Sequence, residues 1–136
     1  MPDMNIIVIG GESDNDVKCM TPIDENIISL TGKKAPVVLY IPTANGDDPL
    51  KIADFKSKYA GAGCTVTALA LLTSPFPHAQ QISSMFEKAD IIYVAGGNTR
   101  AMLAVWREFG VIALLKEARD QGKILSGVSA GAICWF

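Results

Sequence analysis

Five short apolar runs divide the chain and predict five buried β-strands. They occupy residues 5–9, 37–41, 64–69, 90–95 and a run that begins at residue 124. The first two runs are continuously apolar at residues 6–9 and 37–41, which is typical of strands covered on both faces of a parallel sheet. Four of the runs lead directly into glycine-rich or turn-rich segments. The pattern therefore predicts loops gathered at the ends of parallel strands.

Apolar residues at helical spacing fill the intervals between these runs. The predicted helices span residues 22–30, 49–60, 78–89, 99–109 and 111–121. Thr21 is placed to cap the first helix and Pro22 to open it, with Ile23, Ile27 and Leu30 at helical intervals. In the second helix, we expect the lysines to form a solvated face. These lysines are Lys51, Lys56 and Lys58. The buried stripe predicted for the third helix consists of Ile82, Met85, Phe86 and Ala89.

The alternation of strands and helices requires right-handed crossovers and a sheet covered on both faces. It predicts a three-layer α/β/α, doubly wound, mostly parallel sheet of flavodoxin-like type. With 136 residues and no repeat, linker or low-complexity tract, one domain over residues 1–136 accounts for the chain.

Composition excludes some classes of function. Apolar residues make up 49% of the chain and charged residues 19%, and the net charge is −2. This balance excludes disorder and gives no electrostatic reason to expect a nucleic-acid partner. No run has membrane-spanning length, and the start of the chain shows no export signal. Widely spaced Cys19, Cys64 and Cys134 suggest buried, reduced thiols and a cytoplasmic location.

The fifth run ends in Gly127-Val128-Ser129-Ala130-Gly131, a Gly-x-Ser-x-Gly pattern between a predicted strand and a predicted helix. Such a nucleophile elbow lifts the serine hydroxyl above the sheet, and its glycines permit the tight turn. Ser129 is therefore the candidate nucleophile. The alternative is a turn of small residues that serves packing alone.

A second glycine turn, Gly96-Gly97-Asn98, follows the fourth predicted strand. Ligands bind at the carboxyl ends of strands in open parallel sheets. The backbone amides of Gly97 and Ala130 could thus face one oxygen atom held near Ser129, as an oxyanion hole does. Alternatively, the turn only precedes a helix capped by Asn98 or Thr99. Neither glycine turn has the full pattern of a dinucleotide or phosphate loop, so nucleotide binding is a minor alternative.

Residues 93–99 and 127–132 together resemble the strand-end turn and nucleophile elbow of the peptidase E (aspartyl dipeptidase) family. That family is related to the cyanophycinases and has the class I glutamine amidotransferase-like fold. The resemblance implies that Ser129 is the nucleophile and that the amides of Gly97 and Ala130 form the oxyanion hole. It implies hydrolysis of small peptides, in peptidase E itself dipeptides with an N-terminal aspartate, without cofactor or metal. Serine at the elbow argues against thiolate glutaminase chemistry.

The resemblance also implies an incomplete chain, because family members continue past the elbow and take their catalytic histidine and acidic partner from that portion. His78, the one histidine here, is expected to have a surface or capping role. We therefore expect the 136-residue chain alone to be inactive. The alternative hypothesis is a shortened, catalytically inactive binding or assembly domain, such as a homodimer whose second subunit covers the open sheet edge.

Overall fold

A computed structural model describes residues 5–9 and 18–128 of the chain. Its centre is a parallel sheet of five strands in the order β1-β5-β4-β2-β3. The strands are β1 (Asn5–Ile9), β2 (Val37–Ile41), β3 (Thr65–Ala68), β4 (Ile91–Val94) and β5 (Ile124–Val128). All five predicted strands are present, and the edge positions belong to β1 and β3.

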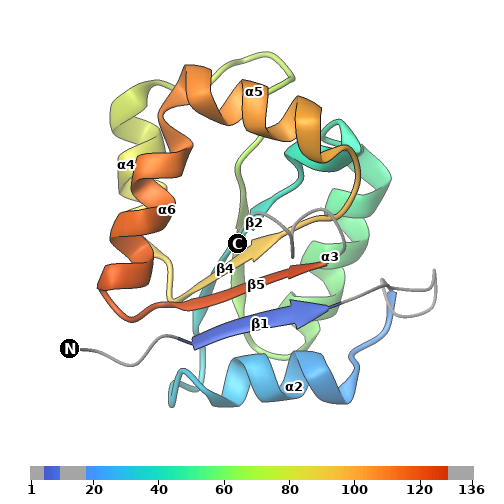
Figure 1. Ribbon diagram of the computed structural model, residues 1–136. Coiled ribbons are helices and arrows are strands. Elements are labelled where there is room, and N and C mark those ends of the chain that lie inside the picture. The colour runs from blue at the N-terminus through green and yellow to red at the C-terminus, as the bar shows by residue number, and fades with distance from the viewer. Residues whose placement is uncertain (1–4, 10–17, 129–136) are drawn as a thin grey trace.

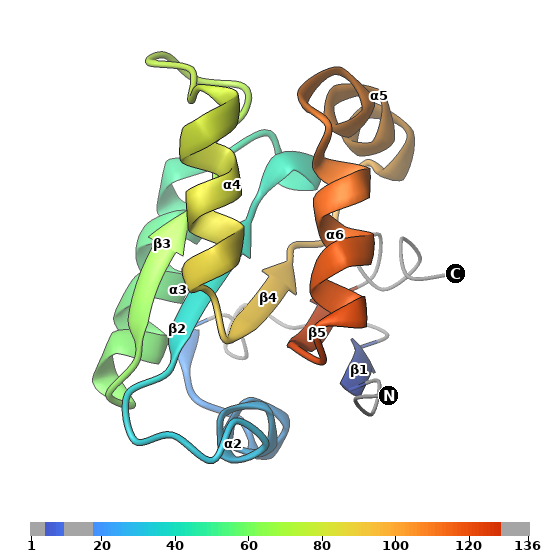
Figure 2. The ribbon, with the colours of Figure 1, turned by 90° about the vertical axis from the view of Figure 1, so that its left-hand side faces the viewer.

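Helices cover both faces of the sheet (Figure 1). They are α2 (Pro22–Ser29), α3 (Pro49–Gly61), α4 (Ala79–Lys88), α5 (Thr99–Phe109) and α6 (Val111–Asp120), with a short 3-10 turn η1 (Thr43–Asn45). Figure 2 shows α4, α5 and α6 on one side of the strands and α2 and α3 on the other. This arrangement confirms the three-layer α/β/α fold.

Two separate cores result from the alternation of side chains along each strand. Leu39 and Ile41 of β2 pack toward Trp106 and the helices α4, α5 and α6. Their neighbours Val38 and Tyr40 pack toward Phe55 and the opposite helices. The central strands β2 and β4 are therefore buried on both faces, which explains their continuously apolar sequences.

Local signals fix where the helices begin. Thr21 caps α2 in a reciprocal capping box, and Pro22 occupies its first turn, as predicted. Asn98 caps α5, and its side-chain oxygen accepts a hydrogen bond from the amide of Ala101 at 3.0 Å. Ile27 is the buried member of the apolar triplet predicted for α2, whereas Ile23 and Leu30 are nearly half exposed.

The prediction of a solvated lysine face on α3 is wrong for one residue. Lys51 and Lys56 are exposed, but Lys58 is buried with 7% exposure. Its ammonium lies 3.0 Å from a carboxylate oxygen of the buried Asp24 on α2. Asp24 also accepts hydrogen bonds from the backbone and hydroxyl of Thr21 and, at 2.7 Å, from the hydroxyl of Tyr59. This shared carboxylate joins α2 to α3.

Burial and the adjacent Asp24 carboxylate raise the pKa of Tyr59, so its phenol stays protonated and donates to Asp24. Helical periodicity does not predict this cluster. In a sequence, a buried lysine cannot be told from one that lays its aliphatic stem along the surface and keeps its ammonium in water.

The cysteine prediction is confirmed at Cys64, which is buried and whose thiol pKa is raised by that burial. It is wrong at Cys19, which is exposed. Cys134 lies outside the described residues. Within the part of the chain that the structure describes, no helix is both long and apolar enough to cross a membrane.

Lys58→Ala should lower the free energy of unfolding by about 3 kcal/mol, because it leaves a buried carboxylate without its cation. Lys56→Ala, on an exposed position of the same helix, should change it by less than about 0.5 kcal/mol. Urea denaturation followed by circular dichroism measures both. Equal effects of the two substitutions would contradict the buried ion pair.

Candidate active site

The candidate site lies where the strand order reverses. After β2, the chain passes through α3 to the edge strand β3. It then returns to β4 through α4, which lies on the opposite face of the sheet from α3. Adjacent strands β2 and β4 therefore lie at a topological switch point, where ligands bind in doubly wound folds. The loops at their carboxyl ends are residues 42–48 and 95–98, and β5 ends beside β4 at the same edge.

Gly97 has a backbone conformation that only glycine adopts readily, with φ of +147°. A Cβ atom at this position would lie 2.0 Å from the carbonyl oxygen of Ala44 and 2.4 Å from its carbon. The next amide, that of Asn98, donates to the same Ala44 oxygen at 2.7 Å. The backbone after β4 is thus pressed against the turn η1 that follows β2.

The amide of Gly97 is available for an external oxygen. Gly97 is exposed, and no carbonyl of the described residues accepts a hydrogen bond from its N–H. The adjacent α5 begins at Thr99 and presents the positive end of its dipole at the same place. This backbone geometry favours a small anion or a developing oxyanion.

A buried hydrogen bond joins η1 to α5. The indole Nε1–H of Trp106 donates to the hydroxyl oxygen of Thr43 at 3.1 Å. Both side chains are buried, with 1% and 3% exposure. Because Trp106 belongs to α5, the helix that begins next to Gly97 also holds the turn against which Gly97 packs.

Asp47 ties the same loop to the segment after β3. Asp47 is buried, and its backbone has the left-handed conformation, with φ of 55°. Its Oδ2 accepts a hydrogen bond from the amide of Leu72 at 2.7 Å. Its Oδ1 has no hydrogen-bond partner among the described residues. Burial raises the pKa of Asp47, and the amides of Leu72, Leu71 and Thr73 offset only part of that effect.

The structure describes part of the predicted site. Gly97 lies in the loop after β4, at the carboxyl ends of the strands, and its predicted oxyanion role stays a prediction. The buried Gly127 pairs with Val94 in the β4–β5 register. Ser129, Ala130 and Gly131 lie outside the described residues, so their predicted roles stay predictions.

His78 is the exposed N-cap residue of α4, as expected. His78 follows the edge strand β3 in the chain. In the sheet, β3 lies three strand spacings, or about 14 Å, from β5.

Three supporting residues were not predicted from the sequence: Thr43, Ala44 and Trp106. The signal available for η1 was its turn-rich sequence after the second strand, Thr43-Ala44-Asn45-Gly46-Asp47-Asp48, to which we attached no function. Trp106 lies inside the helix predicted before Gly110, and nothing in the local sequence indicates its partner. Long-range partners of this kind are invisible to periodicity.

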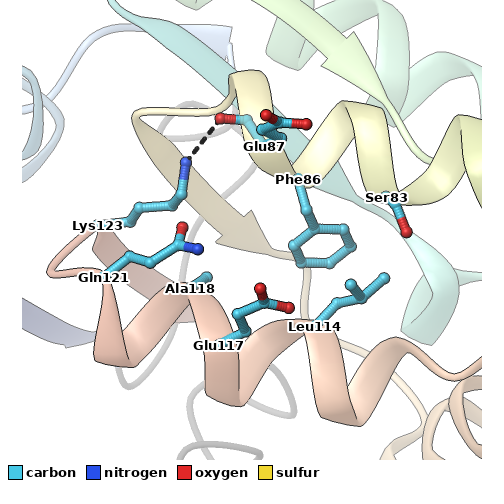
Figure 3. A pocket seen from close by; sticks show the side chains of 8 residues that line it. All are labelled: Ser83, Phe86, Glu87, Leu114, Glu117, Ala118, Gln121 and Lys123. Carbon is cyan, nitrogen blue, oxygen red and sulfur yellow. Dashed lines mark hydrogen bonds between the residues drawn. The ribbon is translucent and has the colours of Figure 1, made fainter.

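A cavity of about 340 Å³ lies between α4 and α6, near the amino ends of the strands (Figure 3). Its most buried polar group is the ammonium of Lys123, which donates to the carbonyl oxygens of Glu87 and Ala89 at the end of α4. Burial lowers the pKa of Lys123. The lysine thus satisfies the last carbonyls of a helix, a structural role. Among the described residues, no cluster of three potential ligands could hold a metal ion.

The described residues form an α/β fold with a candidate site at the carboxyl edge of a parallel sheet, and comparisons with known proteins agree with this fold. The sequence profile of peptidase family S51 matches residues 6–136. The chain is 34% identical over 131 residues to the uncharacterized peptidase YgaJ of Bacillus subtilis, covering 96% of this chain and 56% of that protein. It is 30% identical to an uncharacterized peptidase of Pasteurella multocida, covering 71% of this chain and 46% of that protein. The chain belongs to peptidase family S51.

Solved structures show the same fold. A protein from Listeria monocytogenes EGD-e, provisionally named peptidase E, superposes with a TM-score of 0.70 at 24% identity, over 95% of this chain and 60% of that one. A peptidase from an acI-B1 actinobacterium superposes with a TM-score of 0.74 at 19% identity, over 93% and 54%. These two likenesses show the fold, and together with the match to family S51 they confirm the resemblance to the peptidase E family. The chain spans about half the length of these relatives, from 46% to 60%.

Gly97→Ala should lower the free energy of unfolding by about 3 kcal/mol, because the added methyl group collides with Ala44 at a strained backbone position. Gly110→Ala is the matched control: Gly110 also has a positive φ, +71°, but open space around it. It should cost about 1 kcal/mol. Chemical denaturation compares the two, and equal costs would contradict the close approach at Gly97.

Asp47→Asn should change the pH dependence of stability. The fold favours the protonated form of Asp47, so the carboxyl group's contribution to stability falls as the pH rises above the unfolded value of 3.8. Asparagine does not titrate, so the stability of the variant relative to the parent should improve between pH 4 and pH 7. Urea denaturation at several pH values measures this difference. A difference that does not change with pH would contradict the raised pKa.

Proposed function

We propose that this chain carries the nucleophile and oxyanion hole of a serine-type peptidase, with Ser129 as the nucleophile. The observation that carries the proposal is Gly97. The residue is exposed, its N–H has no backbone acceptor among the described residues, and its turn packs closely against Ala44. The adjacent strand β5 ends at the same edge with Val128, and Ser129 follows it directly in the sequence.

The proposed chemistry is attack of the Ser129 hydroxyl on a peptide carbonyl. Negative charge then develops on the carbonyl oxygen, and the amides of Gly97 and Ala130 stabilise it by donating hydrogen bonds. Backbone donors fixed before the reaction need no reorganisation, and losing one typically costs a factor of about 10² to 10³ in rate. The support from η1 is what would keep the Gly97 donor fixed.

A general base is also needed, because a protonated serine is a poor nucleophile at neutral pH. His78 is a poor candidate, since it is exposed and caps α4 on the β3 side of the sheet. We propose that the base is a histidine from outside these 136 residues. The isolated chain should then lack normal turnover.

The proposed substrates are small peptides, with dipeptides that begin with aspartate as the first choice because of the resemblance to peptidase E. No cofactor is required for this chemistry. The buried, protonated thiol of Cys64 is compatible with a reducing cytoplasm, which is the proposed location.

Ser129→Ala should abolish labelling by a fluorophosphonate probe and hydrolysis of Asp-Xaa dipeptides, tested in the protein extended by its base-bearing portion. Both reactions need the Ser129 hydroxyl as nucleophile. Mass spectrometry of the labelled peptide and a ninhydrin assay of released amino acids measure the two effects.

Ser126→Ala is the matched control on the same strand. Ser126 is fully buried, and its hydroxyl has no hydrogen-bond partner among the described residues. This variant should be labelled and active like the parent. If the parent carries no label at Ser129, or if Ser129→Ala hydrolyses the dipeptides at the parental rate, the proposal is wrong.

A further inference from the structure

Two buried side chains behind the glycine turn form a hydrogen bond that links distant parts of the chain. The indole of Trp106, in α5, donates to the hydroxyl of Thr43, in η1, at 3.1 Å. Both residues are almost completely buried. A buried indole N–H needs an acceptor, and the Thr43 hydroxyl oxygen supplies it.

The effect of this bond passes to Gly97 through one residue. Ala44 follows Thr43, and its carbonyl oxygen accepts the amide of Asn98 at 2.7 Å. The same oxygen occupies the place that a side chain of residue 97 would need, 2.0 Å from its Cβ position. A shift of Ala44 by a few tenths of an ångström would therefore move the Gly97–Asn98 peptide.

The contacts close into a ring. Asn98 is the N-cap residue of α5, and Trp106 lies about 12 Å further along that helix. The indole of Trp106 donates a hydrogen bond to the hydroxyl of Thr43. The carbonyl oxygen of the next residue, Ala44, accepts a hydrogen bond from the amide of Asn98. Because α5 is rigid, the ring leaves the turn at Gly97 little freedom relative to the helix.

We infer that the Thr43–Trp106 hydrogen bond is a positioning device that sets the direction of the Gly97 amide. Thr43 and Trp106 are positioning residues and touch no substrate. The catalytic consequence rests on the proposed function, in which the Gly97 amide binds the oxyanion. Small displacements of catalytic groups cost up to about 10²-fold in rate, so even a modest loosening is measurable.

Thr43→Val separates positioning from packing, because it keeps the shape of the side chain and removes the acceptor. Thr43→Ser restores the acceptor with a smaller side chain. Thr67→Val is the matched control: Thr67, in β3, has a buried hydroxyl without a partner among the described residues, so the same chemical change breaks no hydrogen bond.

The first measurement is the ¹H–¹⁵N spectrum of the 136-residue chain. Thr43→Val should shift the cross-peaks of the Gly97 amide and the Trp106 indole and accelerate hydrogen exchange at the indole. Thr43→Ser should return both cross-peaks toward their parental positions, and Thr67→Val should leave them in place. Unmoved Gly97 and Trp106 cross-peaks in Thr43→Val would overturn the inference.

The second measurement is the rate at which a fluorophosphonate labels Ser129 in the extended protein. Thr43→Val should lower it about tenfold, with recovery in Thr43→Ser and no loss in Thr67→Val. Parental labelling in Thr43→Val would overturn the catalytic part of the inference. Absence of labelling in the parent would refute the proposed function instead, and the spectra would then decide the positioning role.

Discussion

The contact between the backbone at Gly97 and the carbonyl of Ala44 connects most features of this structure. It occurs at the switch point, where the loops after β2 and β4 meet. Two backbones can approach so closely only if one of them has no side chain. The contact in turn fixes the start of α5, because Asn98 both donates to Ala44 and caps that helix. The geometry of the candidate oxyanion site is thus part of how the second half of the fold packs onto the first.

The two layers of helices are held in different ways. Apolar packing around Trp106 and the sheet dominates the side of α4, α5 and α6. On the other side, Asp24 and Lys58 form a buried ion pair beside Tyr59. Four donors surround the Asp24 carboxylate, so the desolvation of the charge is offset by hydrogen bonds. A cluster of this kind fixes the relative position of α2 and α3, because polar partners must meet in one geometry.

The sheet has two ends with different roles. At the amino ends of the strands, Lys123 binds the last carbonyls of α4 beside a polar cavity. At the carboxyl ends, the exposed residue Gly97 lies next to the positive end of α5. The proposed function places its chemistry at the second end, at the amide of Gly97.

The sequence by itself determined the strands, the helices and their layers, and it indicated the carboxyl edge of the sheet as the place of the proposed site. These features follow from short-range rules: continuous apolar runs for buried strands, helical spacing between them, and glycine where the backbone turns sharply. Gly97 and Ser129 stood out because their glycine contexts are local. Only the tertiary structure decided that Lys58 is buried against Asp24 and that Trp106 holds Thr43. Each of these pairs joins residues more than thirty positions apart, and no local pattern encodes which polar group a buried donor will meet.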